Sequence, residues 1–185
     1  MYGRSVNEID QVAQFRQRHG IDELIDVHTH FMPKNVMDKV WEYFDTAGPL
    51  VGRTWPITYR HTEEERVERL RAFGVRYFTS MLYPHRPEMA AWLNSWSADF
   101  ASRTPDCLHT ATFYPEPGAA SYVAEAISSG AVVFKSHIQV GDYTPLDPQL
   151  KDVWGLLEDE GYRSSCTAGR GPLPERTPDP SRWPN

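Results

Sequence analysis

Cysteine is scarce in this 185-residue sequence, and Cys107 and Cys166 cannot form the disulfide framework of a small secreted protein. No apolar run approaches the ~20 residues of a membrane span, and no signal peptide opens the chain. The formal net charge of -6 argues against the basic face that general nucleic-acid binding requires. We therefore expect a cytoplasmic protein whose partners include neither nucleic acid nor a membrane.

Several catalytic signatures are also missing. The sequence contains no Gly-rich phosphate loop, no Gly-x-Ser-x-Gly elbow and no paired-carboxylate signature. It does contain enough apolar material for a core, with 40% hydrophobic and 12% aromatic residues, so disorder of the whole chain is not expected. Its length suits one domain or the start of a larger one.

Apolar periodicity divides the chain into alternating strands and helices. A first helix at 6–19 ends at Gly20, and strand–helix units follow up to residue 161. The predicted strands are 24–30, 75–81, 108–114 and 131–138, and the predicted helices are 34–45, 62–73, 88–103, 119–129 and one that begins at Asp147-Pro148. Such alternation builds a parallel sheet with helices outside, either doubly wound or closed into a barrel. Four tryptophans at helical core spacing are predicted to pack: Trp41, Trp92, Trp96 and Trp154.

The pattern separates three parts: an amino-terminal helix at 1–20, four strand–helix units at 21–161, and an irregular tail at 162–185. The tail is rich in proline and arginine and poor in aliphatic residues, as in a disordered segment. A fifth strand is nevertheless due directly after Gly161. One base missing after the Gly161 codon would restore a buried strand that ends in a histidine, followed by a Gly-rich loop. We therefore favour a shifted reading frame over a true tail.

A His-x-His pair, His28 and His30, stands at the carboxyl end of the first predicted strand. Because strand side chains alternate with period 2, both imidazoles are expected on one face. Two nitrogen ligands close together suit a divalent metal, most of all Zn²⁺. Ordinary turn histidines are the alternative, and we predict that both residues are metal ligands.

The segment Ile25–Pro33 resembles the first-strand motif of the amidohydrolase superfamily. It is most similar to the amidohydrolase-related group that includes aminocarboxymuconate-semialdehyde decarboxylase. Val133–His137 and Asp147–Leu157 resemble that group's fourth strand and the helix behind it, so the resemblance covers residues 21–161. It implies that the chain is the amino-terminal half of a metal-dependent (β/α)8 TIM barrel. In that family the remaining metal ligands come from the fifth, sixth and eighth strands. The resemblance therefore assigns a metal-binding role to His28 and His30 alone in this sequence.

Three further residues are candidates to line the site. Lys135 and His137 share one face of the predicted strand 131–138, and His85 follows the second strand. Loops and strand ends on that side of a barrel build active sites. In two-metal relatives a fourth-strand lysine is carbamylated and bridges the metals, whereas one-metal relatives lack that role. The alternatives are a lysine paired with a carboxylate, a hydrogen-bonded core histidine and a solvated turn histidine.

The resemblance implies a metal-dependent hydrolase or non-oxidative decarboxylase that acts on a small carbonyl or carboxylate compound, with Zn²⁺ as the expected cofactor. The sequence identifies no catalytic acid or base. The 185-residue chain itself is expected to bind metal weakly and to lack useful turnover. Two alternatives remain open. One is a TatD-like or PHP-type metal-dependent phosphoesterase, which also opens with His-x-His. The other is a non-catalytic half-barrel that is stabilised by association with further chains, as in a homo-oligomer, because half a barrel exposes sheet edges and part of its core.

Overall fold

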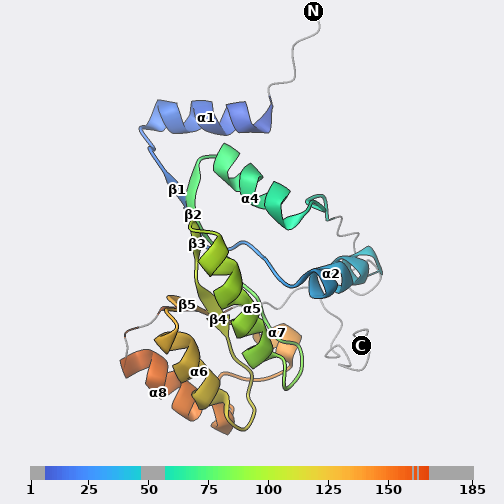
Figure 1. Cartoon of the computed structure of the whole chain (residues 1–185), viewed down its shortest axis with the longest axis vertical. Helices are drawn as coiled ribbons and strands as arrows, with labels where there is room; N and C mark the ends of the chain where they lie inside the picture. The colour runs from blue at the N-terminus through green and yellow to red at the C-terminus, as the bar shows by residue number, and fades with distance from the viewer. Residues whose placement is uncertain (1–6, 47–56, 160, 162, 167–185) are drawn as a thin grey trace, which may run out of the picture.

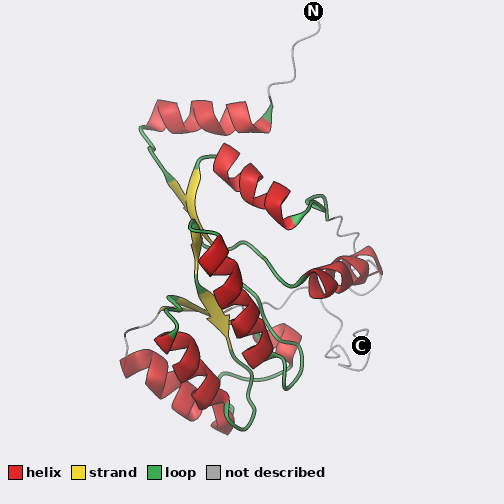
Figure 2. Ribbon diagram, viewed as in Figure 1, coloured by secondary structure: helices red, strands yellow, loops and turns green. Residues whose placement is uncertain are grey.

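The computed structural model describes residues 7–46, 57–159, 161 and 163–166. In them, short strands form a thin central layer with helices beside it (Figure 1 and Figure 2). The strands are β1 (Leu24–Asp26), β2 (Val75–Thr79), β3 (Cys107–Leu108), β4 (Thr110–Thr112), β5 (Val133–Ser136) and β6 (Arg163–Cys166). The helices are α1 (Glu8–His19), α2 (Lys34–Thr46), α4 (Glu63–Ala72), α5 (Ala90–Arg103), α6 (Ala119–Ser128), α7 (Ile138–Gly141), the 3-10 helix η1 (Pro148–Leu150) and α8 (Lys151–Asp159).

All strand pairs within the described residues are parallel. β2 lies between β1 and β3, and β5 lies between β4 and β6. Parallel neighbours need a crossover connection, and the helices between the strands provide it. The predicted α/β class with parallel strands is therefore confirmed. The described strands do not close into a barrel, because β1 and β6 each pair along one side only.

The third predicted strand, 108–114, is split at His109. The His109 carbonyl accepts a hydrogen bond from the Val132 N–H at 2.9 Å, and β4 begins one residue later. Beside β4, the Asn94 side chain of α5 takes the place of a neighbouring strand. Its nitrogen donates to the Thr112 carbonyl at 3.0 Å, and its oxygen accepts from the Thr112 N–H at 2.8 Å. A buried side chain thus satisfies backbone groups that would otherwise lack partners.

Three apolar clusters hold the helices on the sheet. Phe113 and Phe134 of the first cluster pack against α6 and α8. The second cluster surrounds Phe78 of β2 and includes Phe31 and Phe100. The third cluster joins α2 to α5 and to the segment after β2, and consists of Met32, Met37, Leu82, Met89 and Leu93. The two residues after His30 therefore belong to the core, which anchors the His-x-His segment on its carboxyl side.

Local signals in the sequence place several helix ends correctly. Thr62 and Glu65 form the predicted capping box at the start of α4, with both reciprocal hydrogen bonds present. Gly20 ends α1 in the left-handed region with φ 64°. Asp147 caps the turn that begins at Pro148, although this first turn is the 3-10 helix η1.

Two further predictions of secondary structure and packing are wrong. The predicted strand 131–138 stops at Ser136, and its end forms the unpredicted short helix α7. Trp92 was expected in the core but is 45% exposed. The buried face of α5 instead carries Ala90, Leu93, Asn94, Ser97 and Phe100. These residues follow the spacing i, i+3, i+4, i+7 and i+10 of a single helix face, and Trp92 lies off that face.

The segment after Gly161 contributes a strand. β6 pairs in parallel with β5 over its whole length, from Val133 with Arg163 to Ser136 with Cys166. It occupies the place at which the strand–helix alternation expects a fifth strand. The rest of the expected irregular tail, 167–185, lies outside the described residues.

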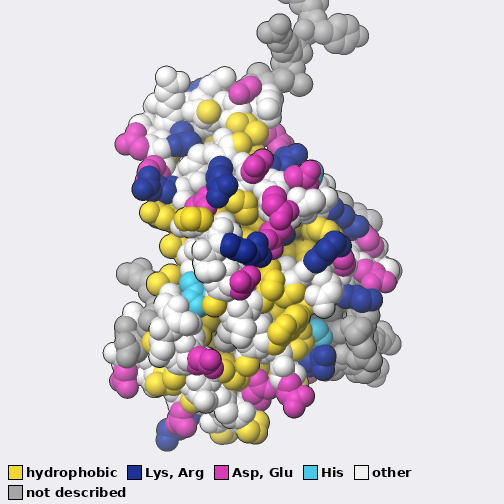
Figure 3. Space-filling model, in the orientation of Figure 1, with side chains coloured by type: hydrophobic (Ala, Val, Ile, Leu, Met, Phe, Trp, Pro, Cys, Tyr) yellow, Lys and Arg dark blue, Asp and Glu magenta, His cyan; other side chains and the backbone are white. Residues whose placement is uncertain are grey.

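The surface carries both signs of charge. On the face shown in Figure 3, basic and acidic side chains are intermixed over α1 and α4, with apolar side chains between them. Ion pairs such as Arg71–Asp106 at 2.6 Å link neighbouring units, and exposed pairs of this kind contribute little stability. Within the described ranges, no helix combines the length and apolar character needed to cross a bilayer.

Gly74, after α4, should tolerate alanine poorly. Its φ is 81°, and an added Cβ would overlap the guanidinium of Arg16, which donates to the Phe73 and Asp22 carbonyls. We expect Gly74→Ala to lower the free energy of unfolding by about 2 kcal/mol, measured by urea denaturation. Gly130 is the matched control, since its φ is 91° but no atom lies within 4 Å of its Cβ position. Gly130→Ala should cost about 1 kcal/mol, and equal losses in both variants would exclude a role for Arg16.

Candidate metal site

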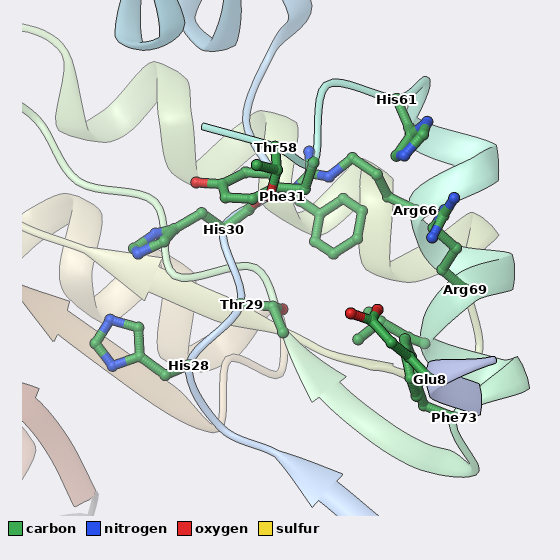
Figure 4. A pocket seen from close by; sticks show the side chains of 12 residues that line it. Glu8, His28, Thr29, His30, Phe31, Thr58, His61, Arg66, Arg69 and Phe73 are labelled. Carbon is green, nitrogen blue, oxygen red and sulfur yellow. Dashed lines mark hydrogen bonds between the residues drawn. The ribbon is translucent and has the colours of Figure 1, made fainter. Parts of the chain in front are cut away.

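The His-x-His pair lies in a turn after β1, because the strand ends at Asp26 and not at His30 as predicted. The Asp26 carboxylate accepts a hydrogen bond from the His28 N–H at 3.0 Å, which turns the chain out of the strand. The two imidazole centroids are 5.1 Å apart with the rings edge to face. Figure 4 shows both rings on one side of the segment and Thr29 on the other. Their shared side is therefore a property of this turn rather than of a strand pleat.

His30 has the hydrogen bonding of a metal ligand. Its Nδ1 lies 2.8 Å from the Met81 carbonyl oxygen. Because a carbonyl only accepts, we assign the proton to Nδ1, which leaves the lone pair on Nε2. Burial, with smaller contributions from His28, Lys135 and Arg66, lowers the pKa of His30 to about 4 against the opposing effect of this hydrogen bond. The ring is therefore neutral at pH 7, as metal binding requires.

Lys135 is close to the histidine pair in space although β5 lies far along the chain. Its side chain is fully buried, and its backbone carbonyl accepts a hydrogen bond from the Thr112 hydroxyl at 2.8 Å. Burial is the main cause of the lowered pKa of His28 and of His137, and the positive charge of Lys135 lowers both further. The ammonium group therefore lies within electrostatic reach of the histidines.

His137 directly follows β5 and caps α7. Its Nδ1 accepts a hydrogen bond from the Val140 N–H at 3.4 Å. The neutral ring must then carry its proton on Nε2, which makes that nitrogen a donor and not a ligand. Burial, together with Lys135 and the other two histidines, lowers the pKa of His137 to about 4. In this conformation His137 lines the site without offering a lone pair to a metal.

Tyr83 is a site residue that the sequence did not single out. Its ring lies between two histidine rings, with centroids 5.6 Å from His30 and 4.6 Å from His137. Burial raises the pKa of Tyr83 to about 12, so its hydroxyl stays protonated at neutral pH. The one available signal was its position in the loop after the second predicted strand, since such loops form sites in parallel α/β folds.

Arg66 of α4 was also missed. Its Nη2 donates to the His30 carbonyl, and its guanidinium carbon lies 4.3 Å from the Phe31 ring centroid. Burial lowers the pKa of Arg66, which forms no ion pair with a carboxylate of the described residues. A cavity of about 660 Å³ lies beside it, with His28 and His30 at one end and Arg66 with its α4 neighbours at the other (Figure 4). No local pattern predicts this arginine, because its partners are far away in sequence.

The structure separates His85 from the other predicted site residues. Lys135 lies within electrostatic reach of His28, His30 and His137, and Tyr83 packs on the His30 and His137 rings. His85 instead lines a second cavity, to which Tyr83 also contributes. Burial lowers the pKa of His85, and the neighbouring Arg86 lowers it further. His85 therefore has a different environment from the histidine pair.

The donor set fits a divalent metal only in part. His28 and His30 offer two imidazole nitrogens, and the segment between them is fixed by the Thr29 hydroxyl, which donates to the Thr79 carbonyl. The Thr79 hydroxyl is buried without a hydrogen-bond partner among the described residues. In the part of the chain that the structure describes, no group of three or more His, Cys, Asp or Glu could hold a metal. The pair would supply two of the three or four protein ligands that a zinc site needs.

Comparison with known proteins identifies the fold. The chain is similar to the crystal structure of an amidohydrolase II protein, with a TM-score of 0.61 and 21% sequence identity. The two chains share a fold. The match covers 82% of this chain and 52% of the other, so this chain spans about half the length of that structure. No protein-family model matches the sequence, and no match was found among curated proteins.

Proposed function

We propose that this chain supplies part of a divalent-metal enzyme, a hydrolase or non-oxidative decarboxylase that acts on a small carbonyl or carboxylate compound. His28 and His30 would hold the metal, and Zn²⁺ is the ion that their chemistry favours. The geometry of His30 carries this proposal. Its Nδ1 faces the Met81 carbonyl, and its Nε2 is left available beside the His28 ring. The amidohydrolase-like fold supports the proposal, because the pair follows the first strand of the parallel layer.

The surrounding residues would hold this pair and shape its surroundings. Arg66 fixes the His30 backbone through its carbonyl, and the Met81 carbonyl fixes the ring. Tyr83 packs on the His30 ring and limits the access of water from that side. The chemistry that a divalent ion supplies in such a place is Lewis-acid activation of water or of a substrate oxygen. Lys135 places a buried positive charge nearby, which favours an anionic substrate group.

The described residues supply two ligands, and we therefore propose weak metal binding by this chain. Titration of the metal-free protein with Zn²⁺ should show one site, and His30→Ala should weaken it at least about tenfold. His61→Ala is the matched control, since His61 lines the same cavity but lies at its other end beside Glu65. Its zinc affinity should equal that of the wild type.

Three results would contradict the proposal. Equal losses in the His30 and His61 variants would place the metal elsewhere, and the absence of any zinc site would remove the metal function from this chain. Efficient Zn²⁺-supported turnover by the purified 185-residue chain would refute the expectation of weak binding. Selective activity on phosphodiesters would favour the phosphoesterase alternative.

A further inference from the structure

A second cavity of about 250 Å³ lies between α2, the loop after β2 and α7. We propose that it binds a small apolar carboxylate, with its apolar body among methionine, valine and tryptophan side chains and its carboxylate at Arg86. This inference goes beyond the metal site, because none of the groups involved is one of the two metal-binding histidines. The lining residues are Met32, Asn35, Val36, Lys39, Val40, Tyr83, His85, Arg86, Met89, Trp92 and Val140.

The apolar part of the cavity sets the size of the ligand body. Met32 and Met89 are buried, and both belong to the cluster that joins α2 to α5. Methionine side chains adapt to a planar or branched group, and aromatic faces add stacking. An apolar cavity of about 150 Å³ accepts benzene, so about 250 Å³ holds one ring or a branched aliphatic group together with a carboxylate.

Trp92 supports this assignment by its exposure. It is 45% exposed although it stands on α5 directly beside the buried face of that helix. Exposed tryptophan costs hydrophobic free energy that a bound apolar group would recover. An apolar ligand in the cavity would cover the part of Trp92 that faces it.

The charged groups at the cavity have one sign. Arg86 and Lys39 are among the lining residues, and none of the lining residues is acidic. Lys39 already pairs with Glu42 at 3.2 Å, whereas Arg86 forms no ion pair or hydrogen bond with a described residue. An arginine fork presents two parallel donors to a carboxylate, which favours this anion over a neutral polar group.

Tyr83 is shared between this cavity and the rings of His30 and His137. A ligand in the cavity would therefore lie beside the metal site and would not coordinate a metal. Binding of this ligand can be measured in the presence of a chelator. The result then does not depend on whether His28 and His30 bind a metal.

The test uses benzoate as the probe, with isothermal titration calorimetry on the full chain in the presence of a chelator. We expect saturable binding of one benzoate, and a roughly tenfold weaker affinity after Arg86→Gln. Benzyl alcohol, the neutral analogue, should also bind about tenfold more weakly than benzoate. Val36→Phe should abolish binding by filling the cavity. Lys34→Gln on the exposed side of α2 is the control and should leave the affinity unchanged.

Circular dichroism and thermal melting of each variant would show that it remains folded, and Arg86→Gln, at an exposed position, should melt as the wild type does. The proposal is overturned if benzoate shows no saturable binding. It is also overturned if Arg86→Gln and Val36→Phe bind as well as the wild type. Binding that requires Zn²⁺ and disappears in His30→Ala would place the carboxylate at the metal site instead.

Discussion

Phe31→Ala should lower the free energy of unfolding by about 3–5 kcal/mol, the usual cost of deleting a buried aromatic ring. Phe31 is 1% exposed, and its ring centroid lies 5.2 Å from that of Phe78 and 5.0 Å from that of Phe100. The Arg66 guanidinium covers its ring as well. The substitution would leave a cavity where β1, α4 and α5 meet. Urea denaturation followed by circular dichroism measures the loss.

The same substitution should also weaken zinc binding, because Phe31 directly follows His30. Its N–H donates to the Ser80 carbonyl at 3.0 Å, so ring and backbone together hold the segment on the core. Phe100→Ala is the matched control, since it empties the same cluster from α5 without changing a residue of the histidine segment. We expect a similar loss of stability from both variants and a several-fold loss of zinc affinity from Phe31→Ala alone. If both variants unfold, Phe31→Leu and Phe100→Leu repeat the comparison with smaller cavities.

The parallel α/β class could be predicted because its signals are local. The capping box at Thr62 and the left-handed glycine at Gly20 depend on residues within one turn of each other. Apolar periodicity likewise reports which side of a single element is buried. These features survive folding because tertiary contacts reinforce them rather than oppose them.

The split of the third strand could not be predicted in the same way. After the split, both backbone groups of Thr112 bond to the side chain of Asn94, a residue of α5. Nothing near residue 112 in the sequence reports that contact. The exposure of Trp92 was missed for a related reason, since the buried face of α5 includes Asn94 and Ser97, which an apolar pattern ignores.

In the candidate site, too, some residues could be predicted from the sequence and others could not. The histidine pair and Lys135 follow from motif and strand position. Tyr83 comes from the loop after β2 and Arg66 from α4, and both meet His30 only in the folded chain. The shared side of His28 and His30 was expected from a strand pleat, but the Asp26 turn produces it. The placement was thus predictable from residue order, although its physical cause was not.

Acid should destabilise the metal-free protein between pH 7 and pH 5. The folded chain keeps His30 and His137 neutral with pKa values of about 4 because both are buried, and Lys135 adds to this. In the unfolded chain the pKa of each is about 6.5. Below pH 6.5 the unfolded state therefore binds protons that the folded state excludes, and stability falls with pH until the folded pKa is reached. Each of the two histidines should contribute a loss of about 2 kcal/mol between pH 7 and pH 5.

His137→Asn isolates one of these contributions, since asparagine can still cap α7 but does not titrate. Urea denaturation at pH 7, 6 and 5 in the presence of a chelator measures the free energy of unfolding at each pH. Between pH 7 and pH 5 the variant should lose about 2 kcal/mol less of this free energy than the wild type does. His19→Asn is the control, because His19 is exposed on α1, and the loss between pH 7 and pH 5 should then match the wild type. Stopping at pH 5 leaves out the titration of Asp106, whose pKa is lowered by Arg71 and whose contribution to stability is lost only in stronger acid. An unchanged pH dependence in His137→Asn would mean that this ring accepts a proton in the folded protein, and that burial beside Lys135 does not exclude it.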